Sequence, residues 1–150
     1  MNNVFAMITL KNSSFYTSYA LESFFKYTMV EDGDEFLLIN NDGDKVDKFS
    51  IYKKINVFNN NIPFSFAKNV NQGIDVAKKN KKNLVFLNND IIFTKNWFEP
   101  LKLDFKNISI PVSNQLFLYH TECKNLILKP TMNFKNFNGN YDLLNKIVTK

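Results

Sequence analysis

The sequence predicts an α/β fold built around a mainly parallel β-sheet. One observation is a set of short, almost continuous apolar runs, such as VFAMITL at 4–10 and NLVFL at 83–87. Such runs are typical of strands buried on both faces. A second observation is that segments with apolar residues at helical spacing alternate with these runs, as in α/β proteins. In sheets of this kind ligands bind at the carboxyl ends of the strands, so the polar residues that follow the strands are the candidates for function.

Five strands are expected, and each is an apolar run bounded by polar residues. They are expected, in chain order, at 4–10, 35–39, 54–58, 83–87 and 108–112. The second strand runs into the polar turn NNDGD at 40–44, and the third into a loop at 59–63. Asn, Asp, Gly and Pro in these connections are the residues that form turns.

Three helices are expected between the strands, because apolar residues there recur every three or four positions. They are expected at 14–28, 65–79 and 94–102, with Ser13 or Ser14 capping the first and Thr94 the third. The apolar faces are made by Ala20, Leu21, Phe24 and Phe25 in the first helix, by Phe66, Ala67, Val70, Ile74 and Ala77 in the second, and by Trp97, Phe98 and Leu101 in the third.

The same patterns predict the core and the end of the chain. Residues 115–119 and 126–129 have the composition of strands, and 141–148 that of a helix capped near Asn140. We expect one domain over 1–150, with 113–150 as a short C-terminal extension. Ten side chains are expected to be largely buried, namely Phe5, Met7, Leu21, Phe25, Leu37, Ile39, Ala67, Ile74, Val85 and Leu87.

The basic charge of the chain is not the signature of a specific nucleic-acid binder. The formal net charge is +5, but all 19 basic residues are lysine and none is arginine, while 24 residues are asparagine. Arginine is the usual partner of bases and of phosphates held by two hydrogen bonds. The dense KKNKK at 78–82 is typical of the solvated end of a helix. Nucleic-acid binding is therefore the least favoured of three functional hypotheses.

Several other classes of protein are excluded by what the sequence lacks. With one cysteine, Cys123, and one histidine, His120, there is neither an intramolecular disulfide nor a Cys/His zinc site. The four glycines form no GxGxxG or GxxxxGK motif, which argues against dinucleotide dehydrogenases and P-loop enzymes. No apolar run has the roughly 18 residues of a membrane span, and the start does not read as a signal peptide. We expect a cytoplasmic protein, with peripheral membrane association left open.

The segment FLNNDIIF at 86–93 is the strongest candidate for chemistry. Here an apolar strand delivers Asn88, Asn89 and Asp90 to its carboxyl end, and alternation places Asn88 and Asp90 on the same side. One carboxylate and one amide oxygen suit a hard cation such as Mg²⁺ or Mn²⁺, which takes further ligands from water and substrate phosphates. The alternative is an asparagine-rich turn without a ligand.

The segment PFSFAKNVNQGIDVA at 63–77 combines aromatic, asparagine and glycine residues, and it is followed by a strand that ends L-N-N-D and by a tryptophan. The residues of this pattern are Phe64, Phe66, Asn71, Gly73, Ile74, Ala77, Leu87 to Asp90 and Trp97. With these residues the stretch at 63–101 resembles the family 2 glycosyltransferases of the GT-A fold, which often carry F-N-F-S-x-x-x-N-x-G-I…A before such a strand. VFAMITLKN and EFLLINNDGD are similar to the first two strands of the family and the turns after them, so the resemblance covers roughly residues 4–112.

The resemblance implies a Rossmann-like, nucleotide-sugar-binding domain whose donor-binding part covers 1–112. It implies a divalent cation, Mn²⁺ or Mg²⁺, at the D-x-D-like motif, with Asp90 and Asn88 as metal ligands. It also implies that the chain transfers a sugar from a nucleotide-diphosphate sugar to an acceptor hydroxyl. The implied contacts to the nucleotide are Thr9, Asn12, Asn40, Asn41, Asn71 and Asn88.

The chain departs from the family pattern in two ways. Asn40 and Asn88 stand where the family commonly has aspartate, and amides bring no charge to a cation. The acceptor-binding half, which carries the catalytic base, has no counterpart in the 60 residues after Asp90, so no base is assigned. The alternative hypothesis is a non-catalytic remnant that binds a nucleotide sugar or a partner. A partner chain that supplies the acceptor half, for a glycan, lipid or protein acceptor, is also left open.

Overall fold

The computed structural model describes residues 2–41, 46, 48–49, 52, 54–60, 63–102 and 139–148. By compactness the chain divides into two units, Met1–Phe93 and Thr94–Lys150. Each unit is described by itself. The expectation of one domain, with a donor-binding part over 1–112, stays a prediction.

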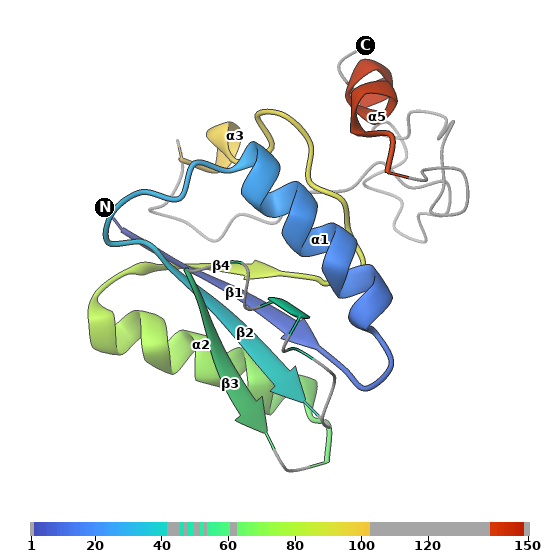
Figure 1. Cartoon of the computed structure of the whole chain (residues 1–150). Helices are drawn as coiled ribbons and strands as arrows, with labels where there is room; N and C mark the ends of the chain where they lie inside the picture. Colours follow the sequence, from blue (N-terminus) through green and yellow to red (C-terminus); the bar gives the residue numbers. More distant parts are fainter. Residues whose placement is uncertain are drawn as a thin grey trace, which may run out of the picture. The chain divides into compact units, whose positions relative to one another are not determined.

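Four parallel strands form the sheet of the first unit (Figure 1). They are β1 (Asn3–Thr9), β2 (Glu35–Asn41), β3 (Ile55–Asn60) and β4 (Asn83–Leu87), in the order β3-β2-β1-β4. The expected α/β class with a mainly parallel sheet is therefore confirmed for the described strands. Along the chain, β2 is added beside β1 and β3 beside β2, and β4 is then added on the other side of β1. The direction in which strands are added therefore reverses between β1 and β4.

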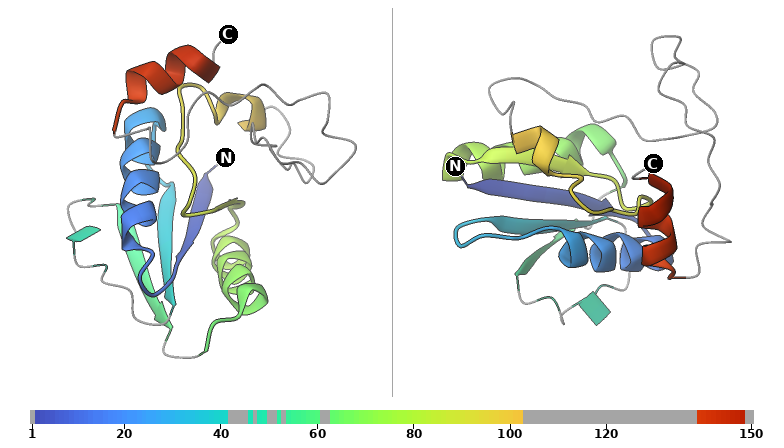
Figure 2. Two further views of the ribbon diagram at one scale, coloured as in Figure 1. Left: turned by 90° about the vertical axis from the view of Figure 1, so that its right-hand side faces the viewer. Right: turned by 90° about the horizontal axis from the view of Figure 1, so that it is seen from above.

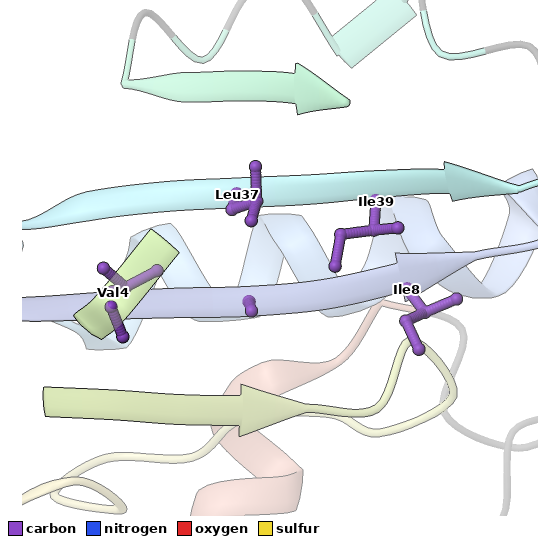
Figure 3. Close-up of a cluster of buried hydrophobic side chains, with 6 residues drawn as sticks. Val4, Ile8, Leu37 and Ile39 are labelled. Carbon is purple, nitrogen blue, oxygen red and sulfur yellow. The ribbon is translucent and has the colours of Figure 1, made fainter. Parts of the chain in front are cut away.

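Two helices cover opposite faces of this sheet, α1 (Ser14–Tyr27) on one and α2 (Phe66–Asn80) on the other (Figures 1 and 2). Under α1 the ring of Phe24 is buried and makes T-shaped contacts with three other rings. The distances between ring centroids are 5.0 Å to Phe5, 4.9 Å to Phe36 and 5.4 Å to Phe93. Under α2 an aliphatic cluster fills the interface. Its buried members are Val4, Ala6, Ile8, Leu37, Ile39 and Ala77 (Figure 3). The alternating side chains of β1 and β2 thus build both cores.

Element boundaries differ from the sequence prediction at several places. β2 and β3 continue through Asn41 and Asn60, so the polar residues expected in turns belong to strands. The reason is register, because Asn40 lies opposite both Thr9 and Asn59 and extends the ladder between strands. The helix expected at 94–102 is only the short α3 (Glu99–Lys102), since Asn96 has a left-handed φ of 62° that a helix excludes.

The buried face of α2 is rotated from the predicted one. Ala67 is exposed, contrary to prediction, and Ile74 is only half-buried, as is Phe25 in α1. The residues that α2 buries are Asn69, Gly73 and Ala77. Gly73 favours this packing, because a Cβ there would lie 3.2 Å from the Ala6 Cβ, so a larger residue would crowd the contact between helix and strand. The other seven predicted core residues are buried, which confirms them.

The second unit contributes α3 and the helix α5 (Tyr141–Val148). The cap predicted near Asn140 is confirmed, since its Oδ1 accepts a hydrogen bond from the Leu143 amide at 3.0 Å. Asn145 of α5 accepts one from the Lys95 amide at 2.8 Å. The strands expected at 108–112, 115–119 and 126–129 lie outside the described residues. Within the described part, no helix is long and apolar enough to cross a membrane.

Candidate functional site

A pocket of about 190 Å³ opens at the carboxyl ends of β1 and β4, on the α2 side of the sheet. Here the direction of strand order reverses, and in open parallel sheets such switch points leave a crevice where ligands bind. The pocket is lined by Ile8, Leu10, Phe64, Phe66, Phe86, Leu87, Asn88, Asn89 and Asp90. It therefore combines an apolar wall with one polar end.

The polar end is built by the turn that follows β4. Within the strand, Leu84 and Phe86 pack toward α2, while Val85 and Leu87 lie on the opposite face and are buried. The chain then turns, leaving Asn88 and Asp90 exposed and both at the pocket. Among the described residues that line this pocket, Asp90 is the one with a charged side chain.

The apolar wall includes two exposed phenylalanines that flank Ser65, the N-cap of α2. Ser65 is extended, and its hydroxyl accepts a hydrogen bond from the Lys68 amide. Phe64 is 49% exposed and Phe66 is 56% exposed, although the Phe66 ring meets Phe86 edge-on at 5.8 Å. The sequence pattern assigned Phe66 to the buried face of the helix. The sequence feature that could have predicted this role is the pair of phenylalanines on either side of the helix N-cap. At that position the two side chains lie near the carboxyl end of the sheet instead of under the helix.

The middle residue of the motif, Asn89, points into a hydrogen-bond network on the α1 side. Its amide donates to the hydroxyls of Ser13 at 3.1 Å and Thr17 at 3.0 Å. The Thr9 hydroxyl is hydrogen-bonded to both of these hydroxyls, at 3.1 Å from Ser13 and 2.8 Å from Thr17. The Ser13 hydroxyl also accepts from the Leu10 amide at 2.8 Å. The network therefore ties the turn after β4 to the end of β1 and the start of α1.

The network explains where the structure places Thr9, a predicted nucleotide contact. Its side chain is fully buried and bonded to Thr17. Ser13 occupies the N-cap position of α1, but its side chain makes no cap hydrogen bond and binds the turn of Leu10 instead. Thr9 thus stabilises the base of the site, and it is not among the residues that line the pocket.

Four more of the predicted nucleotide contacts also lie outside the pocket. Asn40 is buried and donates a hydrogen bond to Asn59 at 2.8 Å, and Asn41 is buried beside it. Asn12 is exposed in the turn before α1, with a φ of 66°, and Asn71 is exposed on α2. Of the predicted site residues, the pocket unites Asn88 and Asp90 alone, and it does not bring them together with Asn40 and Asn41.

The donor set at the polar end fits a cation that arrives with its own phosphate ligands. Asp90 and Asn88 offer one carboxylate and one amide oxygen at an open site. Among the described residues no group of three or more His, Cys, Asp or Glu side chains is placed to hold a metal. Mg²⁺ commonly binds through one or two carboxylates plus substrate phosphates and water. The residues present therefore suit a substrate-borne cation better than a cation held by protein alone.

The start of α2 adds a favourable field for an anion at the same pocket. The N-terminal N–H groups of a helix carry partial positive charge, equivalent to about half an elementary charge. The first turn of α2 contains no acidic residue, and Lys68 lies in it. Phe66, the first residue of α2, lines the pocket. The pocket therefore combines aromatic side chains, the Asp90 carboxylate and the start of a helix.

The sequence was also compared with known protein families and curated proteins. No protein-family model matches the sequence, and a search of curated proteins finds no similar one.

Proposed function

We propose that the chain is a glycosyltransferase of the GT-A type that takes its sugar from a nucleotide-diphosphate sugar. The observation that carries this proposal is the pocket at the switch point of a parallel sheet, with Asp90 and Asn88 at its polar end. The sequence resemblance at 63–101 supports the same assignment. The chemistry of the pocket suits a ligand with a ring, a diphosphate and a cation.

In this proposal Asp90 and Asn88 hold Mn²⁺ or Mg²⁺ together with the donor diphosphate. The cation would offset the charge that develops on the leaving nucleoside diphosphate. The start of α2 favours the same negative charge. Asn89 keeps the turn in place from the other side of the sheet through Ser13 and Thr17. Contacts of Thr9, Asn12, Asn40, Asn41 and Asn71 with the nucleotide stay predictions.

The transfer itself joins an acceptor hydroxyl oxygen to the anomeric carbon while the bond to the diphosphate breaks. The electron pair of that bond leaves with the nucleoside diphosphate, and the hydroxyl proton passes to a base. No residue of the described part is assigned as this base. A partner chain that carries the acceptor-binding half is one way to supply it.

The test is calorimetric titration of UDP-, GDP- and dTDP-sugars into the chain, with and without Mn²⁺. We expect at least one of them to bind more tightly with Mn²⁺, and Asp90→Asn to remove that gain without lowering the melting temperature. Asp75→Asn is the matched control, because Asp75 is exposed on α2 and does not line the pocket. The proposal fails if no nucleotide sugar binds, or if Asp90→Asn binds like the wild type.

A transfer assay then separates an enzyme from a binding protein. Release of nucleoside diphosphate from the sugar that binds, by hydrolysis or by transfer to a simple acceptor, supports catalysis. The single carboxylate at the pocket favours the second candidate, a domain that binds the donor and leaves the chemistry to a partner. Binding without any release of nucleoside diphosphate would support that candidate.

A further inference from the structure

The apolar wall of the pocket contains two half-exposed phenylalanines that metal binding does not explain. Phe64 and Phe66 are two residues apart on either side of an extended Ser65, so their side chains point to the same side of the chain. Both line the pocket and both are about half exposed. Two half-exposed aromatic rings that meet at one pocket, beside a carboxylate, are a feature of ligand sites rather than of an ordinary surface.

Helix geometry explains why these rings are not covered by the fold. At 100° per residue Phe66 lies on the same side of α2 as Gly73, which packs on Ala6 of β1. Phe66 is nevertheless the first residue of α2, level with the carboxyl ends of the strands, and its ring makes a T-shaped contact with Phe86. The contact of Gly73 with β1 sets the rotation of α2, and this rotation leaves Phe66 facing the pocket.

Resting on the function proposed above, we propose that Phe64 and Phe66 bind the nucleobase of the donor by stacking. A base is flat, and every base offers a π-face to an aromatic ring. A pocket of about 190 Å³ has room for one such ring system. Asn88 and Asp90 line the same pocket, and they are the residues that we propose to hold the diphosphate and its cation. The base would then lie on the apolar wall and the phosphates at the polar end.

This placement differs from the contacts that the resemblance implied for the base. Asn40 is buried and hydrogen-bonded to Asn59, so its amide is engaged within the sheet. Ile8 and Leu10 also line the pocket and bring no polar side chain to it. Stacking on such a wall holds a base without reading its edges. We therefore expect UDP and CDP, which share a ribose and differ at the base edge, to bind with similar affinity.

The experiment compares UDP with inorganic pyrophosphate, both with Mn²⁺, in titrations of the wild type and of single variants. Loss of a base-stacking ring weakens binding by about 5- to 150-fold. We expect Phe64→Ala and Phe66→Ala to lose UDP affinity by such a factor and to keep their pyrophosphate affinity. Phe66→Tyr, which keeps the ring, should bind UDP like the wild type. Phe58→Ala is the matched control, because Phe58 is 45% exposed on β3 and does not line the pocket.

The outcomes separate this inference from the proposed function. If UDP binds with Mn²⁺ and neither alanine variant weakens it, the stacking site is wrong while the proposed function stands. Equal loss of UDP and pyrophosphate affinity in both variants would also overturn it, because the rings would then act through the fold. If the wild type binds no nucleoside diphosphate or nucleotide sugar, the proposed function fails and the stacking site with it. Melting temperatures of all variants show whether each is folded.

Discussion

Single side chains at the carboxyl edge of the sheet hold different parts of the site. Asn88 and Asp90 are exposed at the pocket, whereas Asn89 between them turns to the opposite side and donates two hydrogen bonds to Ser13 and Thr17. Asn40 is buried and donates a hydrogen bond to Asn59. An asparagine-rich motif thus divides into residues available to a ligand and residues that hold the backbone.

This division predicts different effects of two neighbouring substitutions. Asn89→Ala should lower the free energy of unfolding by about 1–2 kcal/mol, because it removes two partly buried hydrogen bonds. Asn88→Ala is the control, and as an exposed turn residue it should change stability by less than about 0.5 kcal/mol. Urea unfolding followed by circular dichroism measures both values. Equal losses for the two variants would show that the network does not stabilise the fold.

A second residue predicts how stability depends on pH. Burial raises the pKa of Tyr52 above its ordinary value of 10.0, and the carboxylate of Glu22 raises it further. Its ring stacks on Phe25 at 4.7 Å. Because the folded state holds this proton more tightly, Tyr52 contributes stability that is present below pH 10 and lost as pH rises through the folded pKa.

The test compares the wild type with Tyr52→Phe, which keeps the ring and removes the titrating group. The free energy of unfolding of the wild type should fall more steeply than that of the variant as the pH rises above about 10. Urea unfolding at several pH values gives both curves. Parallel curves would mean that the phenol titrates alike in the folded and unfolded states.

At the scale of elements, the packing of α2 on β1 decides which helix residues face the pocket. Gly73 allows this approach, since an added Cβ would lie 3.2 Å from the Ala6 Cβ and 3.4 Å from Leu84 Cδ1. Gly73→Val should therefore lower the free energy of unfolding by about 1–3 kcal/mol through overpacking. Asn71→Val is the control, because it places the same β-branched side chain on the exposed side of α2. Chemical unfolding measures the difference, and equal effects would contradict the close packing.

At the scale of the whole sheet, β1 and β2 are buried along almost their entire length, and β4 closes one side of the core. Leu87 of β4 is buried next to the pocket. Leu87→Asp should abolish cooperative unfolding, because an unpaired buried charge costs several kcal/mol of a total stability of about 5–15 kcal/mol. Val57→Asp is the control, since Val57 is 41% exposed on the edge strand β3. A soluble Leu87→Asp variant with a sharp thermal transition would refute the burial of β4.

Much of the fold and part of the site could be predicted from local patterns. The strand at 83–87 was predicted with the bounds that β4 has, and α1 and α2 within one residue of theirs at each end. Asn88 and Asp90 were predicted to lie together, because they follow an apolar strand and alternate along it. Helix periodicity alone wrongly predicted that Ala67 is buried. Periodicity indicates that a helix has a buried face, but it does not fix which neighbouring residues of that face contact the sheet.

What the sequence by itself determined is the class of fold and the position of polar residues after buried strands, since both depend on short-range periodicity and turn chemistry. What only the tertiary structure decided is which of those residues meet. The order β3-β2-β1-β4 puts the ends of β1 and β4 together and leaves β2 on the other side of β1, so Asp90 lies at a pocket that Asn40 does not reach. Strand order and helix rotation arise from contacts between distant segments, here Gly73 on Ala6. A local sequence pattern does not determine such long-range contacts.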